Sequence, residues 1–134
     1  QEHYPLYKNY ISTRHSDGDM YPPNLSQFKD FIGNLREYTQ MLEIRDDGEL
    51  ISAGVVDYLE DGLSAIYSYY STESKHKYRS LGTFSILSQI NLAEEMGLSY
   101  LYLGYWIKNS PKMAYKSNYR PLEILKDRQW VLLD

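Results

Sequence analysis

The sequence predicts a mixed α/β fold, because apolar residues alternate with a period of two between residues 39 and 71 and take a helical period between residues 80 and 96. The turn pairs Asp47-Gly48 and Asp61-Gly62 divide the alternating part into three segments, which is typical of an antiparallel meander. We therefore expect strands at 39–45, 50–59 and 63–71.

Two short helices are expected before this meander. The spacing of Tyr4, Tyr7 and Tyr10 predicts an amphipathic helix near the N-terminus. A second helix contains Leu25 and Phe28 and ends at Gly33.

A longer helix is expected after the meander, capped by Ser80 and running to about Met96. Its apolar residues predict a wide, largely buried face formed by Leu81, Phe84, Ile86, Leu87, Ile90 and Ala93. Next come a strand at 100–103, a helix from Pro111 that ends before Pro121, and strands at 122–125 and 130–133. This order fits a GNAT-like acyltransferase fold, a mixed, mainly antiparallel sheet flanked by helices. We expect a single domain, 1–134.

The composition narrows the functional classes. No apolar run approaches the roughly 18 residues that a membrane span needs, so we expect no membrane partner and a cytoplasmic location. Cysteine is absent, which excludes disulfides and thiolate metal sites within these residues. The three histidines show no metal-ligand spacing, so a structural role is favoured for them and no metal or cofactor is expected.

Positive charge gathers in the second half of the chain. The net charge is −4, yet residues 62–122 carry seven basic and three acidic residues, and residues 96–122 carry no acidic residue. This segment is interpreted as a surface for an anion. The alternative is a scatter of solvated charges.

The run Arg79-Ser80-Leu81-Gly82 precedes the long helix, where free N–H groups and the helix dipole favour phosphate. The alternative is an ordinary capped helix with a glycine in its first turn. CoA-dependent members of this fold have a small residue where Phe84 stands, which counts against acetyl-CoA.

Cations recur every four residues at Lys108, Lys112, Lys116 and Arg120. On an α-helix this spacing drifts by about 40° a step, so neighbours share one side. The interleaved rings of Trp106, Tyr115 and Tyr119 would then stack on unpaired bases. The alternative is a solvated amphipathic helix whose aromatic residues belong to the core.

Asp57 continues the alternation of its strand, so its carboxylate is a candidate for holding or deprotonating an amine. An equal alternative is a turn ligand at the strand end. Tyr67 and Tyr69 share a face of the next strand and would orient a carbonyl or a hydroxyl.

Several ordered motifs resemble the C-terminal domain of arginyl-tRNA–protein transferases. They are Asp57–Tyr67, Arg79–Gly82, Tyr100–Trp106, Lys112–Lys116 and Arg120–Glu123. The opening Tyr7-x-x-Tyr10 and Arg14-His15 resemble the bacterial branch, the aspartate/glutamate leucyltransferases. That branch usually has Tyr-Asp-Pro where this chain has Tyr70-Ser71-Thr72, so no role of that aspartate is carried over.

The resemblance implies transfer of leucine from leucyl-tRNA to a protein that begins with Asp or Glu, which creates a degradation signal. The alternatives are an arginyl donor, a CoA-dependent N-acetyltransferase, and a non-catalytic module that binds N-termini or tRNA. Family members begin with a separate N-terminal region that contains cysteines. We therefore expect these residues to be a domain fragment or a processed form without full activity.

The resemblance also suggests roles for residues. The tRNA and its aminoacyl group would meet Arg79, Ser80, Leu81, Gly82, Gly104, Tyr105, Trp106, Lys112, Tyr115 and Lys116. The acidic acceptor side chain would pair with Arg14 or Arg120, and the catalytic candidates are Asp57, Tyr67 and Tyr102.

Overall fold

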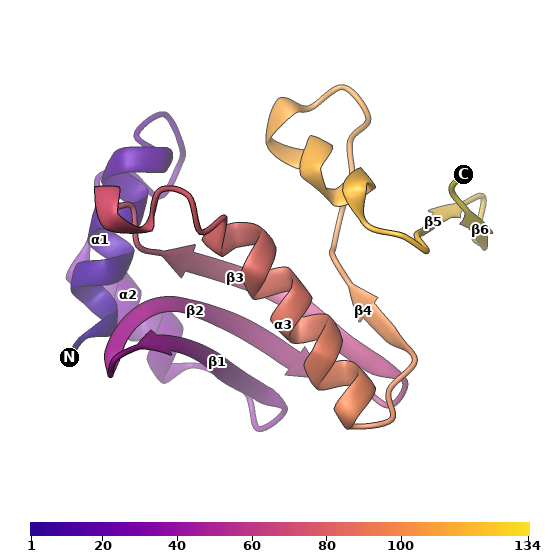
Figure 1. Ribbon diagram of the computed structural model, residues 1–134, viewed down its shortest axis with the longest axis horizontal. Coiled ribbons are helices and arrows are strands. Elements are labelled where there is room, and N and C mark those ends of the chain that lie inside the picture. Colours follow the sequence, from indigo (N-terminus) through magenta and orange to yellow (C-terminus); the bar gives the residue numbers. More distant parts are fainter. The chain divides into compact units, whose positions relative to one another are not determined.

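A computed structural model describes residues 1–134, which form two compact units, 1–102 and 103–134. The first unit contains α1 (His3–Arg14), α2 (Leu25–Gly33), β1 (Thr39–Asp46), β2 (Glu49–Tyr58), β3 (Gly62–Tyr70), the 3-10 helix η1 (Ser74–His76), α3 (Leu81–Glu95) and β4 (Tyr100–Tyr102) (Figure 1). Its strands form one sheet in the order β1-β2-β3-β4. The first three strands are antiparallel and β4 runs parallel to β3, so the predicted meander is confirmed.

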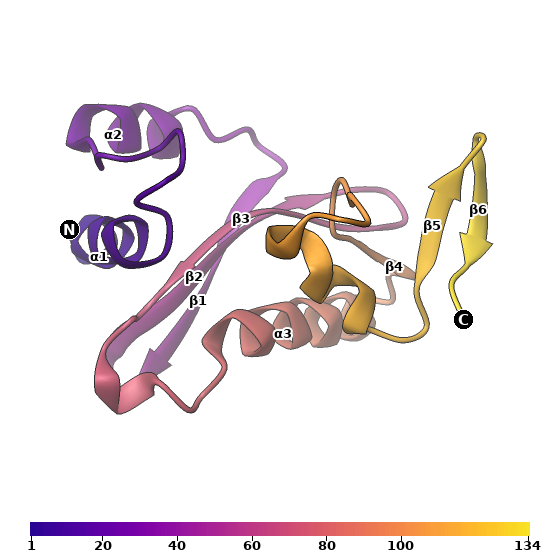
Figure 2. The same cartoon turned by 90° about the horizontal axis from the view of Figure 1, so that it is seen from above.

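Helices cover both faces of this sheet. Helices α1 and α2 lie on one face and α3 lies on the other (Figure 2). The core on the first face is formed by Tyr7, Tyr10, Ile11, Phe28, Ala53 and Tyr69. A smaller core, made of Val56, Leu63 and Ala93, lies beside α3. Strand β2 is therefore buried along most of its length.

The buried face of α3 differs from the predicted one. The buried residues are Leu81, Ser85, Ile86, Gln89 and Ala93, whereas Phe84, Leu87 and Ile90 are exposed. The reason lies in β2, where Gly54 faces this helix. A Cβ atom at Gly54 would lie 3.1 Å from Gln89 Nε2 and 3.5 Å from Ser85 Oγ. The close approach that this glycine allows brings a polar stripe of α3 against the strand.

Strand β3 is irregular on both of its sides, with a β-bulge toward β2 and only a short pairing with β4. Val55 pairs with Tyr67 and Val56 with Ala65, so Ile66 is the extra residue of a β-bulge. Strand β4 pairs only with the segment Gly62–Ser64. The remainder of β3, residues 65–70, has no strand partner on that side, and this open edge runs toward the end of β3 that precedes η1 and α3.

The second unit holds the 3-10 helix η2 (Pro111–Asn118) and a hairpin of β5 (Glu123–Lys126) and β6 (Gln129–Leu132). The hairpin was predicted to within one residue. Its turn residues Asp127 and Arg128 both have positive φ, as a two-residue hairpin loop requires.

The predicted α-helix from Pro111 was wrong in type, because the segment is a 3-10 helix. Ser117 Oγ bonds the carbonyl of Ala114 at 2.7 Å, which competes with regular α-helical bonding. In a 3-10 helix four residues advance by about 120° rather than 40°. Lys112 and Lys116 therefore do not share one side of η2. No helix of the protein is long and apolar enough to span a bilayer.

Candidate functional site

Three residues from distant parts of the first unit meet around one tyrosine ring. Gly82, in the first turn of α3, lies so close to Tyr70 that a Cβ atom there would be 3.2 Å from Tyr70 Cε1. Arg14 Nη2, from the end of α1, donates to the Tyr70 hydroxyl oxygen at 2.9 Å. We call Arg14, Tyr70 and Gly82 the Tyr70 corner. The structure thus brings together Arg14 and Gly82, which the sequence assigned to different substrates.

The corner has the electrostatics of an anion site. The first N–H groups of a helix have no carbonyl partner within that helix, and the Ser80 side chain does not cap them. Ser80 has a φ of 49° and does not supply the predicted capping bond. The Arg14 guanidinium lies 5.6 Å from the centre of the Tyr70 ring, and its hydrogen bond to Tyr70 raises the pKa of Arg14. A permanent cation therefore lies near the positive end of the α3 dipole.

Arg79 is held by an ion pair within the protein. Its Nη1 lies 2.7 Å from Asp46 Oδ2, at the end of β1, and both side chains are partly exposed. Lys75 likewise pairs with Glu49 at 2.7 Å. These two ion pairs fix the loop before α3 to the β1–β2 hairpin. Arg79 can reach a phosphate only by exchanging or sharing Asp46.

Asp57 lies at the other end of the sheet from the Tyr70 corner. It pairs with Ser64 of β3, whereas Tyr70 pairs with Ser52, so six positions of β3, about 20 Å, separate the two places. The structure therefore does not bring Asp57 to Arg14. No small group can touch both residues at once.

A hollow of about 380 Å³ surrounds Asp57. It is lined by residues of α2, the segment after it and the sheet: Asp30, Phe31, Asn34, Leu35, Arg36, Thr39, Val55, Asp57 and Ile66. Thr39 Oγ1 donates to Asp57 Oδ1 at 2.5 Å, and Arg36 Nη1 donates to the Tyr38 hydroxyl at 2.7 Å. The hollow thus offers carboxylates and a guanidinium beside the bulge residue Ile66. Sequence reasoning missed Arg36, because only the fold places it near Asp57.

Tyr67 belongs to an aromatic cluster on the α1/α2 face. Its ring lies 6.5 Å from that of Tyr7 and 6.2 Å from that of Phe31. Burial raises the pKa of Tyr67, so its hydroxyl stays protonated at neutral pH. Tyr102 is placed differently, since its hydroxyl donates to Asp61 Oδ2 at 2.9 Å.

Two of the predicted cations in the second unit bind backbone carbonyls. Lys116 Nζ donates to the carbonyl of Tyr105 at 2.7 Å, and burial lowers the pKa of Lys116. Arg120 Nη1 donates to the carbonyls of Ser117 and Tyr119 at 2.6 and 2.7 Å. Their first role is therefore to hold the chain of this unit.

Other residues of the second unit face solvent. Tyr105 is 90% exposed, and Lys112 and Tyr115 are exposed as well. The indole N–H of the half-buried Trp106 is buried without a hydrogen-bond partner. Gly104 has a φ of 76°, a conformation that favours glycine, and precedes Tyr105. An almost fully exposed tyrosine is a natural platform for a base.

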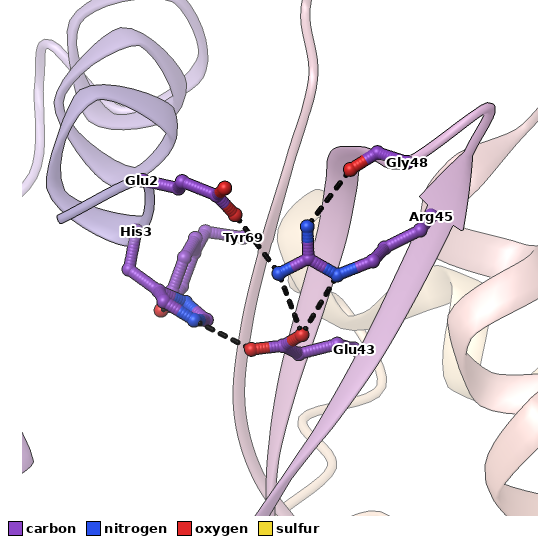
Figure 3. Close-up of polar contacts among 6 residues, drawn as sticks. All are labelled: Glu2, His3, Glu43, Arg45, Gly48 and Tyr69. Carbon is purple, nitrogen blue, oxygen red and sulfur yellow. Dashed lines mark hydrogen bonds and ion pairs between the residues drawn. The ribbon is translucent and has the colours of Figure 1, made fainter.

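A polar network that the sequence did not reveal anchors the start of α1 (Figure 3). His3 Nδ1 lies 2.9 Å from the Tyr69 hydroxyl and its Nε2 lies 2.8 Å from Glu43 Oε1. Arg45 Nη2 lies 2.8 Å from carboxylate oxygens of both Glu43 and Glu2. Hydrogen bonds from Arg45 and then His3 lower the pKa of Glu43. Glu43 and Arg45 are two residues apart in one strand, so their side chains share a face, and this spacing could have indicated the ion pair from the sequence. The network fixes α1 and so helps to place Arg14 at its far end.

Comparison with known proteins gives a consistent assignment. Residues 2–126 match the family described as "Arginine-tRNA-protein transferase, C terminus". The chain is 47% identical over 133 residues to an aspartate/glutamate leucyltransferase of Hahella chejuensis, covering 99% of this chain and 56% of that protein. It is 49% identical over 130 residues to one of Acinetobacter baumannii, covering 97% of this chain and 47% of that protein. The chain thus spans about half the length of these curated relatives.

A solved structure supports the fold. The crystal structure of the ribosomal-protein-S18-alanine N-acetyltransferase from Escherichia coli superposes with a TM-score of 0.58 at 17% identity. The match covers 85% of this chain and 68% of that one. The GNAT-like fold class predicted from the order of elements is thereby confirmed.

Proposed function

The chain belongs to the arginine-tRNA-protein transferase family, and we propose that it forms the part of an aspartate/glutamate leucyltransferase that carries out aminoacyl transfer. The observation that carries this proposal is that relatives with that name match nearly the whole chain at 45 to 49% identity. The donor is then leucyl-tRNA and the acceptor is a protein that begins with Asp or Glu. We place the reaction in the cytoplasm, where aminoacyl-tRNA is found.

The reaction is an aminolysis of an activated ester. The neutral α-amine of the acceptor attacks the ester carbonyl carbon, an amide bond forms, and the bond to the ribose oxygen breaks. The amine loses a proton and the departing ribose oxygen gains one. Holding the two reactants together and stabilising the oxyanion supply most of the acceleration for such a step.

We assign the phosphates of the tRNA 3′ end to the Tyr70 corner. The N-terminus of α3 and the guanidinium of Arg14 lie there, and both favour a phosphate. This changes the role of Arg14, which the sequence assigned to the acceptor. The open edge of β3 offers a path from this corner toward the bulge at Ile66. The single-stranded 3′ end would follow that edge.

We assign the acceptor N-terminus to the hollow around Asp57. The carboxylate of Asp57 would hold the ammonium group and take its proton, as the sequence suggested. Arg36 lines the same hollow and would pair with the acidic side chain of the acceptor. Ile66 lies at this hollow and in the part of β3 whose outer side has no strand partner, so the amine and the ester would meet at the bulge.

Transfer from leucyl-tRNA to peptides that begin with Asp or with Asn tests this assignment in the whole protein that contains this chain. Arg36→Gln should lower kcat/KM for the Asp peptide at least about tenfold, the size of one charge-assisted contact. The Asn peptide should lose little. Arg128→Gln, in the β5–β6 turn, is the matched control. Equal losses for both peptides would contradict the acceptor site.

The fold neighbour is an N-acetyltransferase, so acetyl-CoA is the natural competing donor. Phe84 argues against it, because its ring is 50% exposed in the first turn of α3, where a pyrophosphate would need close approach to the backbone. Acetylation of the Asp peptide by acetyl-CoA would favour the competing function.

A further inference from the structure

His76 is a buried histidine without a hydrogen-bond partner. It ends η1, is 4% exposed, and neither of its ring nitrogens has a partner. Other histidines of the chain do have partners: His3 contacts Glu43 and His15 contacts Tyr10. Burial of an imidazole with no hydrogen bond costs free energy, so a ligand that binds one of its nitrogens would stabilise the protein.

Two carboxylates lie at this imidazole. One ligand atom from each of Glu49, Glu73 and His76 can be chosen so that all three lie within 4.8 Å of one another. Glu73 and His76 are three residues apart at a 3-10 helix, where such residues eclipse. Glu49 is the first residue of β2 and comes from the β1–β2 hairpin. The fold thus gathers three donors that linear spacing keeps apart.

We propose that Glu49, Glu73 and His76 bind a divalent transition-metal ion of the zinc type. One imidazole and two carboxylates are a donor set that such ions accept, with water in the open position. Ligand atoms about 2.1 Å from a tetrahedral ion lie about 3.4 Å apart. The two glutamates are exposed and are held by ion pairs to Lys75, so displacement of that lysine lets their side chains rotate by the small amount that closure of the site requires.

The ammonium group of Lys75 contacts the same two carboxylates that the proposed ion would bind. Its Nζ lies 2.7 Å from Glu49 Oε2 and 3.4 Å from Glu73 Oε2, so the ammonium neutralises the two carboxylates. A divalent ion binds by displacing this ammonium. Because Glu49 belongs to the hairpin and Glu73 to the loop before α3, the ion would fasten these segments together. The site does not depend on the proposed function.

The first test is a calorimetric titration of the 134-residue chain with Zn²⁺. Lys75→Met removes the competing charge and should tighten binding about tenfold or more. Lys77→Met is the matched control, because that ammonium lies over the Tyr78 ring instead. It should bind as the wild type does. No binding of Zn²⁺ to the wild type and to Lys75→Met, or an equal gain in both lysine variants, would overturn the proposal.

The second test removes ligands without opening the core. Glu73→Gln and Glu49→Gln lie on the surface, and each should weaken Zn²⁺ binding at least about tenfold. Glu60→Gln, at the β2–β3 turn, should leave it unchanged. In NMR spectra the imidazole signals of His76 should shift on addition of Zn²⁺. Movement of the His3 or His15 signals instead, or unchanged affinity in both glutamate variants, would place the ion elsewhere and contradict the site.

Discussion

Gly82→Ala is the most informative single change at the Tyr70 corner. The new Cβ atom would lie 3.2 Å from Tyr70 Cε1 and 3.3 Å from the Tyr70 hydroxyl, whereas carbon atoms pack best at about 3.5–4.0 Å. The ring must therefore shift by a few tenths of an ångström. It cannot do so alone, because Arg14 bonds its hydroxyl and the Tyr10 ring lies 4.8 Å away.

The expected loss of stability is small. Alanine favours the helix by about 0.5–1 kcal/mol over glycine, and overpacking costs about 1–3 kcal/mol. The free energy of unfolding should therefore fall by between about 0 and about 2.5 kcal/mol. A displaced Arg14 would lose a charge-assisted contact to phosphate, which is worth about 1.5 kcal/mol. The affinity for tRNA that carries no amino acid should therefore fall about tenfold.

Fluorescence anisotropy of labelled tRNA at fixed salt measures the affinity, and urea unfolding measures the stability. Gly33→Ala in α2 is the matched control, since no atom lies within 4 Å of its new Cβ. In a Tyr70→Leu background the obstructing ring is gone, so Gly82→Ala should cost nothing further. If Gly82→Ala bound tRNA as tightly as Gly33→Ala does, the corner would not be the phosphate site.

Three further changes test other parts of the account. The pKa of Glu43 is lowered in the folded protein, chiefly by Arg45, so its stabilising contribution is present above the unfolded value near 4.3 and is lost as pH falls through the lower folded value. Glu43→Gln should therefore flatten the acid side of the stability curve measured by urea unfolding. Arg79→Ala should reduce the slope of log affinity for tRNA against log salt by about 1, and an unchanged slope would remove Arg79 from the interface. Tyr105→Ala should leave thermal unfolding unchanged but weaken tRNA binding by about 1–3 kcal/mol through loss of stacking. Unchanged binding would remove Tyr105 from the site.

The order of elements could be predicted from the sequence because local signals mark it. The Asp47-Gly48 turn, the alternation along β2 and the glycine at position 97 each act within a few residues. One error arose where a tertiary contact decides, because the buried stripe of α3 follows from Gly54 on another element. The other error was local, because the type of η2 follows from the bond of the Ser117 hydroxyl to the carbonyl of Ala114.

The site was less predictable because residues that lie far apart in the sequence form it. The motifs around Gly82 and Asp57 could be picked out, yet their separation along β3 is a matter of strand register. Arg36 was missed because the residues on either side of it form no motif that indicates a binding role. The cluster of Glu49, Glu73 and His76 was missed because its ligands come from two elements, and three-residue spacing has meaning only once a 3-10 helix is known.

We propose that leucyl-tRNA, rather than arginyl-tRNA, is the donor for this protein. The most direct measurement charges tRNA separately with labelled leucine and labelled arginine and follows the label onto a peptide that begins with Asp. The whole protein should transfer leucine and leave arginine on its tRNA. Transfer of arginine in place of leucine, or label that reaches the peptide only from acetyl-CoA, would contradict the account.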